Sequence, residues 1–201
     1  MKQAITLSAA FALALAVQAA AQELKPSEKT VVAGAQAPEF KIKAADGQEV
    51  ELAKLTAKGP VLVRLTCGCL GCDKELDYFK AINAAYKEKG LTTLAVFKEP
   101  QEKVAVYAKQ RNIEMLYAVD PKGESWKTFQ STAMPTNVLI AKGGKIVSIA
   151  AGCDPSGLLA NMISEKAAGL VESESVDVKK KTQEKKAEEK KVEEKKTPPK
   201  E

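Results

Sequence analysis

Histidine is absent from the 201-residue sequence, and aromatic residues make up only 5% of it. Without histidine, the sequence excludes Ser-His and Cys-His catalytic pairs, zinc sites with histidine ligands and C-x-x-C-H haem attachment. The scarcity of aromatics leaves few stacking platforms for bases. The net charge of +5 arises from intermixed lysine and glutamate, not from one basic patch, so we expect no nucleic-acid partner.

Long apolar runs are also scarce, and the most distinct one lies at the N-terminus. A positively charged start precedes an uncharged apolar run, Ile5–Val17, and a small-residue site that ends at Ala21. This order is typical of a secretory signal peptide, so residues 1–21 are expected to be removed. The run is shorter than the ~20 apolar residues that cross a bilayer. We therefore expect an exported protein, periplasmic or secreted, with no membrane span after signal cleavage.

Composition divides the rest of the chain into a folded region, residues 30–171, and a charged tail, residues 172–201. The stretch from Lys179 onward consists of lysine–glutamate blocks, and the only large apolar residue in that stretch is Val192. Such a segment buries too little apolar surface to offset the entropy of ordering. The sequence therefore predicts a disordered, solubilising tail.

Strand and helix patterns alternate through the folded region. The expected strands are Pro60–Val63, Leu91–Phe97, Met115–Val119 and a hairpin of Thr136–Ala141 with Lys145–Ala150. The expected helices are Cys72–Lys89, Glu102–Arg111, a short one around Trp126–Phe129 and a last one to about Ala168, with Asp154 as its N-cap and Pro155 as its first residue. This alternation with a terminal hairpin predicts an α/β fold in which helices flank a mixed central sheet.

The motif Cys69-Leu70-Gly71-Cys72 lies between a buried apolar strand and an amphipathic helix. A helix N-terminus presents unpaired N–H groups and positive dipole charge, which stabilise a thiolate and lower its pKa. Cys69 is the expected nucleophile that attacks a disulfide, and Cys72 the thiol that resolves the mixed disulfide.

Four features place the chain in a known context. They are Gly34–Phe40 with Asp46-Gly47 and Val50–Leu52; Val61–Val63 before Cys69-x-x-Cys72-x-x-Glu75; Met134-Pro135-Thr136; and Gly143–Val147. Over about Val32–Ala168 the chain resembles the thioredoxin superfamily, in particular exported redoxins and TlpA/ResA-like thiol-disulfide oxidoreductases. The resemblance implies a thioredoxin-like fold and an enzyme that reduces or exchanges protein disulfides.

The same resemblance implies roles for individual residues. Pro135 would be a cis proline that shapes a groove for an extended substrate, and Met134 would offer that substrate backbone hydrogen bonds. Glu75 would assist proton movement. The implied partners are exported proteins with disulfides and an unidentified thiol-disulfide electron donor. No metal and no cofactor beyond the redox-active Cys69–Cys72 disulfide is expected.

Two positions depart from the family pattern. Gly68 stands where a tryptophan is usual, and Asp73 stands where a basic residue is usual. An acid beside Cys72 opposes formation of a thiolate there.

Cys67 and Cys153 are the least family-like feature. In this fold the corner that holds Cys153 would lie near the active centre, so we expect all four thiols to converge. One interpretation is a Cys67–Cys153 disulfide that acts as a staple or relay. Another is a four-thiolate site for zinc, Cu(I) or an iron–sulfur cluster. The spacing is unlike that of paired C-x-x-C zinc sites, and export favours oxidation, so the disulfide is preferred.

Two further functions remain as alternatives. Thr66, three residues before Cys69, is similar to the Thr-x-x-Cys part of peroxiredoxins, although Leu62 stands where their proline would be. A thiol peroxidase of this kind would have only Arg64 or Arg111 as its activating arginine. The other alternative is a non-catalytic thioredoxin-like binding module.

Overall fold

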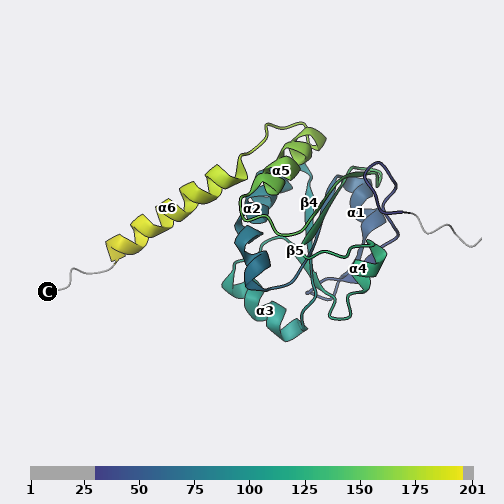
Figure 1. The fold of residues 1–201 in the computed structure, drawn as a ribbon, viewed down its shortest axis with the longest axis horizontal. Coiled ribbons are helices and arrows are strands. Elements are labelled where there is room, and N and C mark those ends of the chain that lie inside the picture. Colours follow the sequence, from purple (N-terminus) through teal and green to yellow (C-terminus); the bar gives the residue numbers. More distant parts are fainter. Residues whose placement is uncertain (1–29, 197–201) are drawn as a thin grey trace, which may run out of the picture.

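The computed structural model describes residues 30–196, and within them five strands form one mixed sheet (Figure 1). In spatial order the strands are β5 (Leu116–Val119), β4 (Thr92–Phe97), β3 (Val61–Thr66), β6 (Thr136–Ile140) and β7 (Ile146–Ala151). Strand β4 pairs in parallel with both β3 and β5, whereas β6 runs antiparallel to β3 and to β7. This is the mixed central sheet that the sequence predicts.

Helices cover both faces of the sheet. The remaining elements are the hairpin β1 (Lys41–Lys43) and β2 (Glu49–Glu51), α1 (Leu52–Lys58), α2 (Leu70–Tyr86), a short 3-10 turn (Lys87–Lys89), α3 (Gln101–Gln110), α4 (Glu124–Thr128), α5 (Leu158–Leu170) and α6 (Val178–Lys196). Figure 1 shows α1 and α4 on one side of the sheet and α2, α3 and α5 on the other. The expected α/β architecture, a mixed central sheet flanked by helices, is confirmed.

Strand β3 is the centre of the core, and all six of its residues are buried. Successive side chains of a strand point to opposite faces. Val63 and Leu65 therefore pack with Leu52 of α1 and Trp126 of α4, whereas Leu62 packs with Ile82 of α2 and its neighbours. Because side chains on both faces of the strand are buried, its sequence is an almost continuous apolar run.

The last helix of the folded region begins later than the sequence indicates. Helix α5 starts at Leu158, not at Pro155, and Gly157 before it has φ +81°. The Asp154 carboxylate accepts hydrogen bonds from the backbone N–H groups of Ser156 at 2.9 Å and Leu159 at 2.8 Å. Asp154 thus still caps the helix, but through a turn that intervenes before the first helical residue.

The structure differs from the expected disordered tail in one respect, because residues 178–196 form α6. Val178 is fully buried in the cluster formed by α2 and α5, and Val176 packs against the same cluster. The N–H of Val178 donates to the Asn161 side chain at 2.9 Å, and the N–H of Val176 donates to the Tyr86 hydroxyl at 2.9 Å. These contacts fix the start of α6, because the apolar anchors lie just before the lysine–glutamate blocks.

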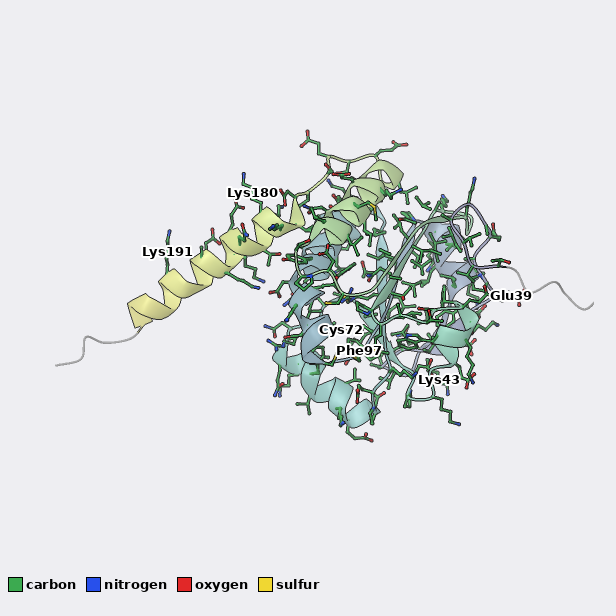
Figure 2. All side chains as sticks on the ribbon, in the orientation of Figure 1. Glu39, Lys43, Cys72, Phe97, Lys180 and Lys191 are labelled. Atoms are coloured by element: carbon green, nitrogen blue, oxygen red, sulfur yellow. The ribbon has the colours of Figure 1, made fainter. Side chains whose placement is uncertain are left out.

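Beyond this anchor, α6 projects away from the domain (Figure 1). Lys180 and Lys191 lie along this charged helix, which Figure 2 shows extending past the other elements. An ion pair of 2.9 Å joins Lys186 to Asp77 of α2. The expected signal peptide, residues 1–21, lies outside the described part of the chain. Among residues 30–196, no helix combines the length and the apolar character needed to cross a membrane.

Candidate active site

The cysteine motif lies where β3 gives way to α2. Strand β3 ends at Thr66 and α2 begins at Leu70, so Cys67 and Cys69 belong to the connection and Cys72 to the first turn of the helix. Cys69 is the N-cap residue, and its carbonyl accepts the first helical hydrogen bond, from the N–H of Asp73 at 3.0 Å. The motif therefore sits at the positive end of a 17-residue helix, as expected.

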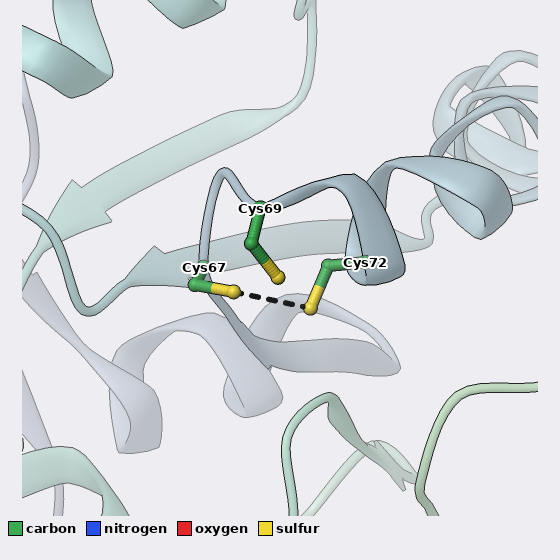
Figure 3. A group of neighbouring side chains, drawn as sticks. All are labelled: Cys67, Cys69 and Cys72. Atoms are coloured by element: carbon green, nitrogen blue, oxygen red, sulfur yellow. Dashed lines mark hydrogen bonds between the residues drawn. The ribbon is translucent and has the colours of Figure 1, made fainter.

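Three sulfur atoms meet at this helix start. The Sγ atoms of Cys67, Cys69 and Cys72 all lie within 4.8 Å of one another, and those of Cys67 and Cys72 are 3.4 Å apart (Figure 3). Cys67 is 8% and Cys72 3% exposed, whereas Cys69 is exposed. Cys69 is thus the member of this group that a large substrate reaches.

The surroundings make Cys69 and Cys67 chemically different. The pKa of Cys69 is lowered, first by a hydrogen bond from the Cys67 thiol and then by the backbone N–H of Cys72. Burial raises the pKa of Cys67 to about 12. Negative charge in the cluster therefore favours Cys69, the sulfur at the surface.

The fourth cysteine does not join the group of three. Cys153 is exposed, and its thiol donates to the Gly71 carbonyl at 3.0 Å. Desolvation, followed by the negative charge of Glu75, raises its pKa. All four cysteines are free thiols, and Cys67 contacts Cys72 instead of Cys153. The expected convergence thus holds for three thiols, while Cys153 lies against the backbone of the motif.

A buried ion pair lies beneath the motif. Arg64 of β3 donates to the Glu75 carboxylate at 3.2 Å, to the Cys72 carbonyl at 3.3 Å and to the Asn137 side chain at 2.8 Å. The Arg64 guanidinium also lies 4.0 Å from the centre of the Phe79 ring. Burial is the main cause of the lowered pKa of Arg64, and Glu75 opposes that shift.

Glu75 is therefore a buried carboxylate held by the arginine. It is 1% exposed, and its second oxygen accepts the backbone N–H of Asp154 at 2.7 Å. From the sequence, Arg64 was a candidate only for the activating arginine of a peroxidase. An arginine within a strand buried on both faces was the signal that it needed a buried carboxylate.

The charge of Asp73, expected to oppose thiolate formation, has partners of its own. Its carboxylate accepts a hydrogen bond from the Tyr107 hydroxyl at 2.9 Å and pairs with Arg111 at 2.6 Å. Arg111 and Arg64 are thus both engaged by carboxylates. The two arginines considered for a peroxidase site do not contact Cys69 in the described structure.

The proline loop reaches the same end of β3. The Met134–Pro135 peptide bond is cis, and the sheet register pairs Leu65 with Thr136. Pro135 therefore lies beside the end of the strand from which the cysteine connection departs. Its carbonyl accepts the N–H of Gly152 at 2.8 Å, which ties the loop to the corner next to Cys153.

A hollow of about 170 Å³ opens next to the exposed cysteine. It is lined by Gly68, Cys69, Glu99, Lys103, Val104 and Tyr107. Sequence spacing does not reveal this hollow, because its residues Lys103, Val104 and Tyr107 belong to α3, which reaches Cys69 only in the folded chain. A larger hollow of about 330 Å³ lies between β1 and α4, and none of the cysteines lines it.

A family model described as "AhpC/TSA family" matches residues 33–149. This chain belongs to the AhpC/TSA family. The matched residues run from the N-terminal lead-in to β7 and so include the three clustered cysteines and the cis proline.

Known proteins similar to this AhpC/TSA-family chain include thiol-disulfide oxidoreductase ResA of Bacillus thuringiensis subsp. konkukian (strain 97-27). That protein is 32% identical over 122 residues, which cover 60% of this chain and 70% of the relative. A putative thioredoxin from Neisseria meningitidis is 30% identical, with a TM-score of 0.55 over 70% of this chain and 91% of that one. A putative thiol:disulfide interchange protein DsbE from Chlorobium tepidum, 24% identical, shares the fold with a TM-score of 0.64 over 70% of this chain and 99% of that one.

Proposed function

We propose that this protein is an exported thiol-disulfide oxidoreductase in which Cys69 attacks protein disulfides and Cys72 resolves the mixed disulfide. The observation that carries this proposal is the contrast between the two thiols at the start of α2. Cys69 is exposed and its pKa is lowered. Cys72 is 3% exposed, and its sulfur lies within 4.8 Å of the Cys69 sulfur. Similarity to a relative named thiol-disulfide oxidoreductase supports the same reaction class.

The reaction transfers electrons between sulfur atoms only. The Cys69 thiolate attacks one sulfur of the substrate disulfide, forms a mixed disulfide and releases the first substrate thiolate. Cys72 then attacks Cys69, forms the Cys69–Cys72 disulfide and releases the second substrate thiolate. Two electrons and two protons pass to the substrate, and a thiol donor must reduce the protein again. The reaction itself requires no metal and no organic cofactor, so chelators are expected to leave it unchanged.

Other residues would bind the substrate or hold the site together. The cis Pro135 lies beside the end of β3, where an extended chain with a disulfide can approach Cys69. We propose that the backbone of Met134 forms hydrogen bonds to that chain. The contacts of Glu75 with Arg64 and with the N–H of Asp154 favour a positioning role for this carboxylate. Its part in proton movement stays a prediction.

The function is tested by the reduction of insulin disulfides with dithiothreitol as donor. Cys69→Ser is expected to lower the rate to that of dithiothreitol alone. Cys153→Ser is the matched control, because it removes an exposed thiol outside the cluster, and it is expected to retain the wild-type rate. Wild-type turnover in the Cys69→Ser protein would overturn the proposal and favour a non-catalytic module.

Export is tested separately, by expression of the full-length chain in a Gram-negative host. The protein is expected in the periplasmic fraction with an intact mass that begins at Gln22. Its presence in the cytoplasm with residues 1–21 retained would contradict export and leave the disulfide chemistry unaffected.

A further inference from the structure

Cys67 has no part in the two-cysteine reaction, yet its sulfur is in contact with that of Cys72. The separation is 3.4 Å, and Figure 3 shows the two sulfur atoms facing each other with the Cys69 sulfur close by. Cys67 follows directly after Thr66, the last residue of the buried central strand, so the sheet fixes where its side chain begins. A thiol attacks a disulfide only when it reaches one of the two sulfur atoms, and Cys67 meets that condition for Cys72.

We propose that Cys67 is a third redox thiol that converts the Cys69–Cys72 disulfide into a buried Cys67–Cys72 disulfide and returns Cys69 to the surface as a free thiol. This inference rests on the proposed function, which supplies the Cys69–Cys72 disulfide. In the step, Cys67 attacks Cys72, the Cys67–Cys72 bond forms and the Cys69–Cys72 bond breaks. The number of disulfides is unchanged, so no oxidant or reductant is needed. The proton of Cys67 passes to Cys69 or to solvent.

At equilibrium, differences between the two competing thiols favour the Cys67–Cys72 disulfide over the Cys69–Cys72 disulfide. Disulfide exchange releases the thiol of lower pKa more readily. The pKa of Cys69 is lowered, whereas burial raises that of Cys67 to about 12. The Sγ atoms of Cys67 and Cys69 also lie within 4.8 Å of each other, so the proton of the attacking thiol has a short path to the departing sulfur.

Burial separates the two disulfides in reactivity. A Cys69–Cys72 disulfide includes the exposed Cys69, so external thiols reach it. A Cys67–Cys72 disulfide joins residues that are 8% and 3% exposed, which restricts access to both of its sulfur atoms. The second form therefore stores the oxidised state away from solvent.

A free Cys69 in the oxidised protein has a functional consequence. Its thiolate can attack a substrate disulfide, and a thiol of the same substrate can then attack the mixed disulfide and expel Cys69. That sequence rearranges substrate disulfides with no net electron transfer, so no electron donor is consumed. The three-thiol cluster thus adds disulfide isomerisation to disulfide reduction.

The test locates the free thiol in the oxidised protein. The experiment uses the full chain with Cys153→Ser, so the remaining thiols are those of the cluster. This protein is oxidised with diamide and quenched with acid. It is then labelled with N-ethylmaleimide, reduced and labelled with iodoacetamide. Trypsin cuts after Arg64 and Lys74, so one peptide, Leu65–Lys74, carries all three cysteines for fragmentation in the mass spectrometer.

We expect N-ethylmaleimide on Cys69 and acetamide on Cys67 and Cys72. The matched control adds Cys67→Ser, or Cys67→Ala if the serine variant does not fold by circular dichroism. In that protein oxidation should leave no thiol for N-ethylmaleimide. Label on Cys67 would show that Cys69–Cys72 persists and would overturn the third-thiol inference alone. If no disulfide forms within the peptide, the proposed function fails as well.

Discussion

Arg64 of β3 and Glu75 of α2 form an ion pair of 3.2 Å in which both side chains are almost completely buried, at 2% and 1% exposure. Arg64 also donates to the Cys72 carbonyl, and Glu75 accepts the N–H of Asp154. The pair thus joins the central strand, the motif helix and the corner that carries Cys153. It sets the position of Cys72 without itself contacting a sulfur atom in the described contacts.

Removal of Glu75 is expected to destabilise the fold. Glu75→Ala leaves the Arg64 charge buried without its partner, a change that typically costs about 3–5 kcal/mol. The free energy of unfolding from urea titration measures this loss. The double variant Arg64→Met/Glu75→Leu removes both charges and should recover most of it, because well-packed apolar replacements of buried pairs are often neutral. A double variant as unstable as Glu75→Ala would contradict this account.

The reactivity of Cys69 is expected to persist to lower pH than that of an ordinary thiol. The thiolate is the reactive form, so alkylation slows as the pH falls through the pKa of Cys69. Because that pKa is lowered, the midpoint should lie on the acid side of the midpoint of an unperturbed cysteine thiol. Rates of iodoacetamide labelling against pH, in the reduced Cys153→Ser protein with Cys69 identified by mass spectrometry, measure the midpoint.

The Cys67 hydrogen bond is the largest cause of this shift, so Cys67→Ala should move the midpoint of Cys69 labelling to higher pH. The matched comparison is Asp73→Asn, which changes a charge in the same helix turn and leaves the Cys67 contact intact. A midpoint unchanged in Cys67→Ala would show that the helix N–H groups alone stabilise the thiolate.

Loss of the buried thiols is expected to trap substrates. Without Cys72, a mixed disulfide on Cys69 has no resolving partner except Cys67, whose sulfur also lies within 4.8 Å. Cys67→Ala/Cys72→Ser should therefore accumulate covalent complexes with disulfide-bearing proteins, seen as bands on non-reducing gels that dithiothreitol removes. The same variant with Cys69→Ser added should form none. Equal trapping by that triple variant would place the nucleophile elsewhere.

The start of α6 is expected to contribute to stability. Val178 is fully buried against α2 and α5, and truncation of such a side chain to alanine costs about 1–3 kcal/mol. Gln183→Ala, on the exposed part of the same helix, should change the free energy of unfolding little. Equal effects of the two substitutions in urea titrations would argue against docking of α6.

Much of the architecture follows from local patterns. The apolar run before the motif became β3, the glycine turn joined β6 to β7, and the helix after Cys72 packs its apolar face on the sheet. The helix α6 was not expected, because the average composition of the lysine–glutamate segment indicates low burial and does not reveal that Val176 and Val178 pack against α2 and α5. Composition also cannot show that the side chains of Tyr86 and Asn161 accept hydrogen bonds from the backbone N–H groups of these valines.

The sequence by itself determined the α/β class, the placement of a C-x-x-C motif at a helix start and the choice of Cys69 as the candidate nucleophile. These depend on periodicity and on neighbours along the chain. Only the tertiary structure decided that Cys67 contacts Cys72 and that Arg64 pairs with Glu75. Both contacts depend on how α2 packs on β3, and that packing fixes distances and burial that no sequence spacing contains.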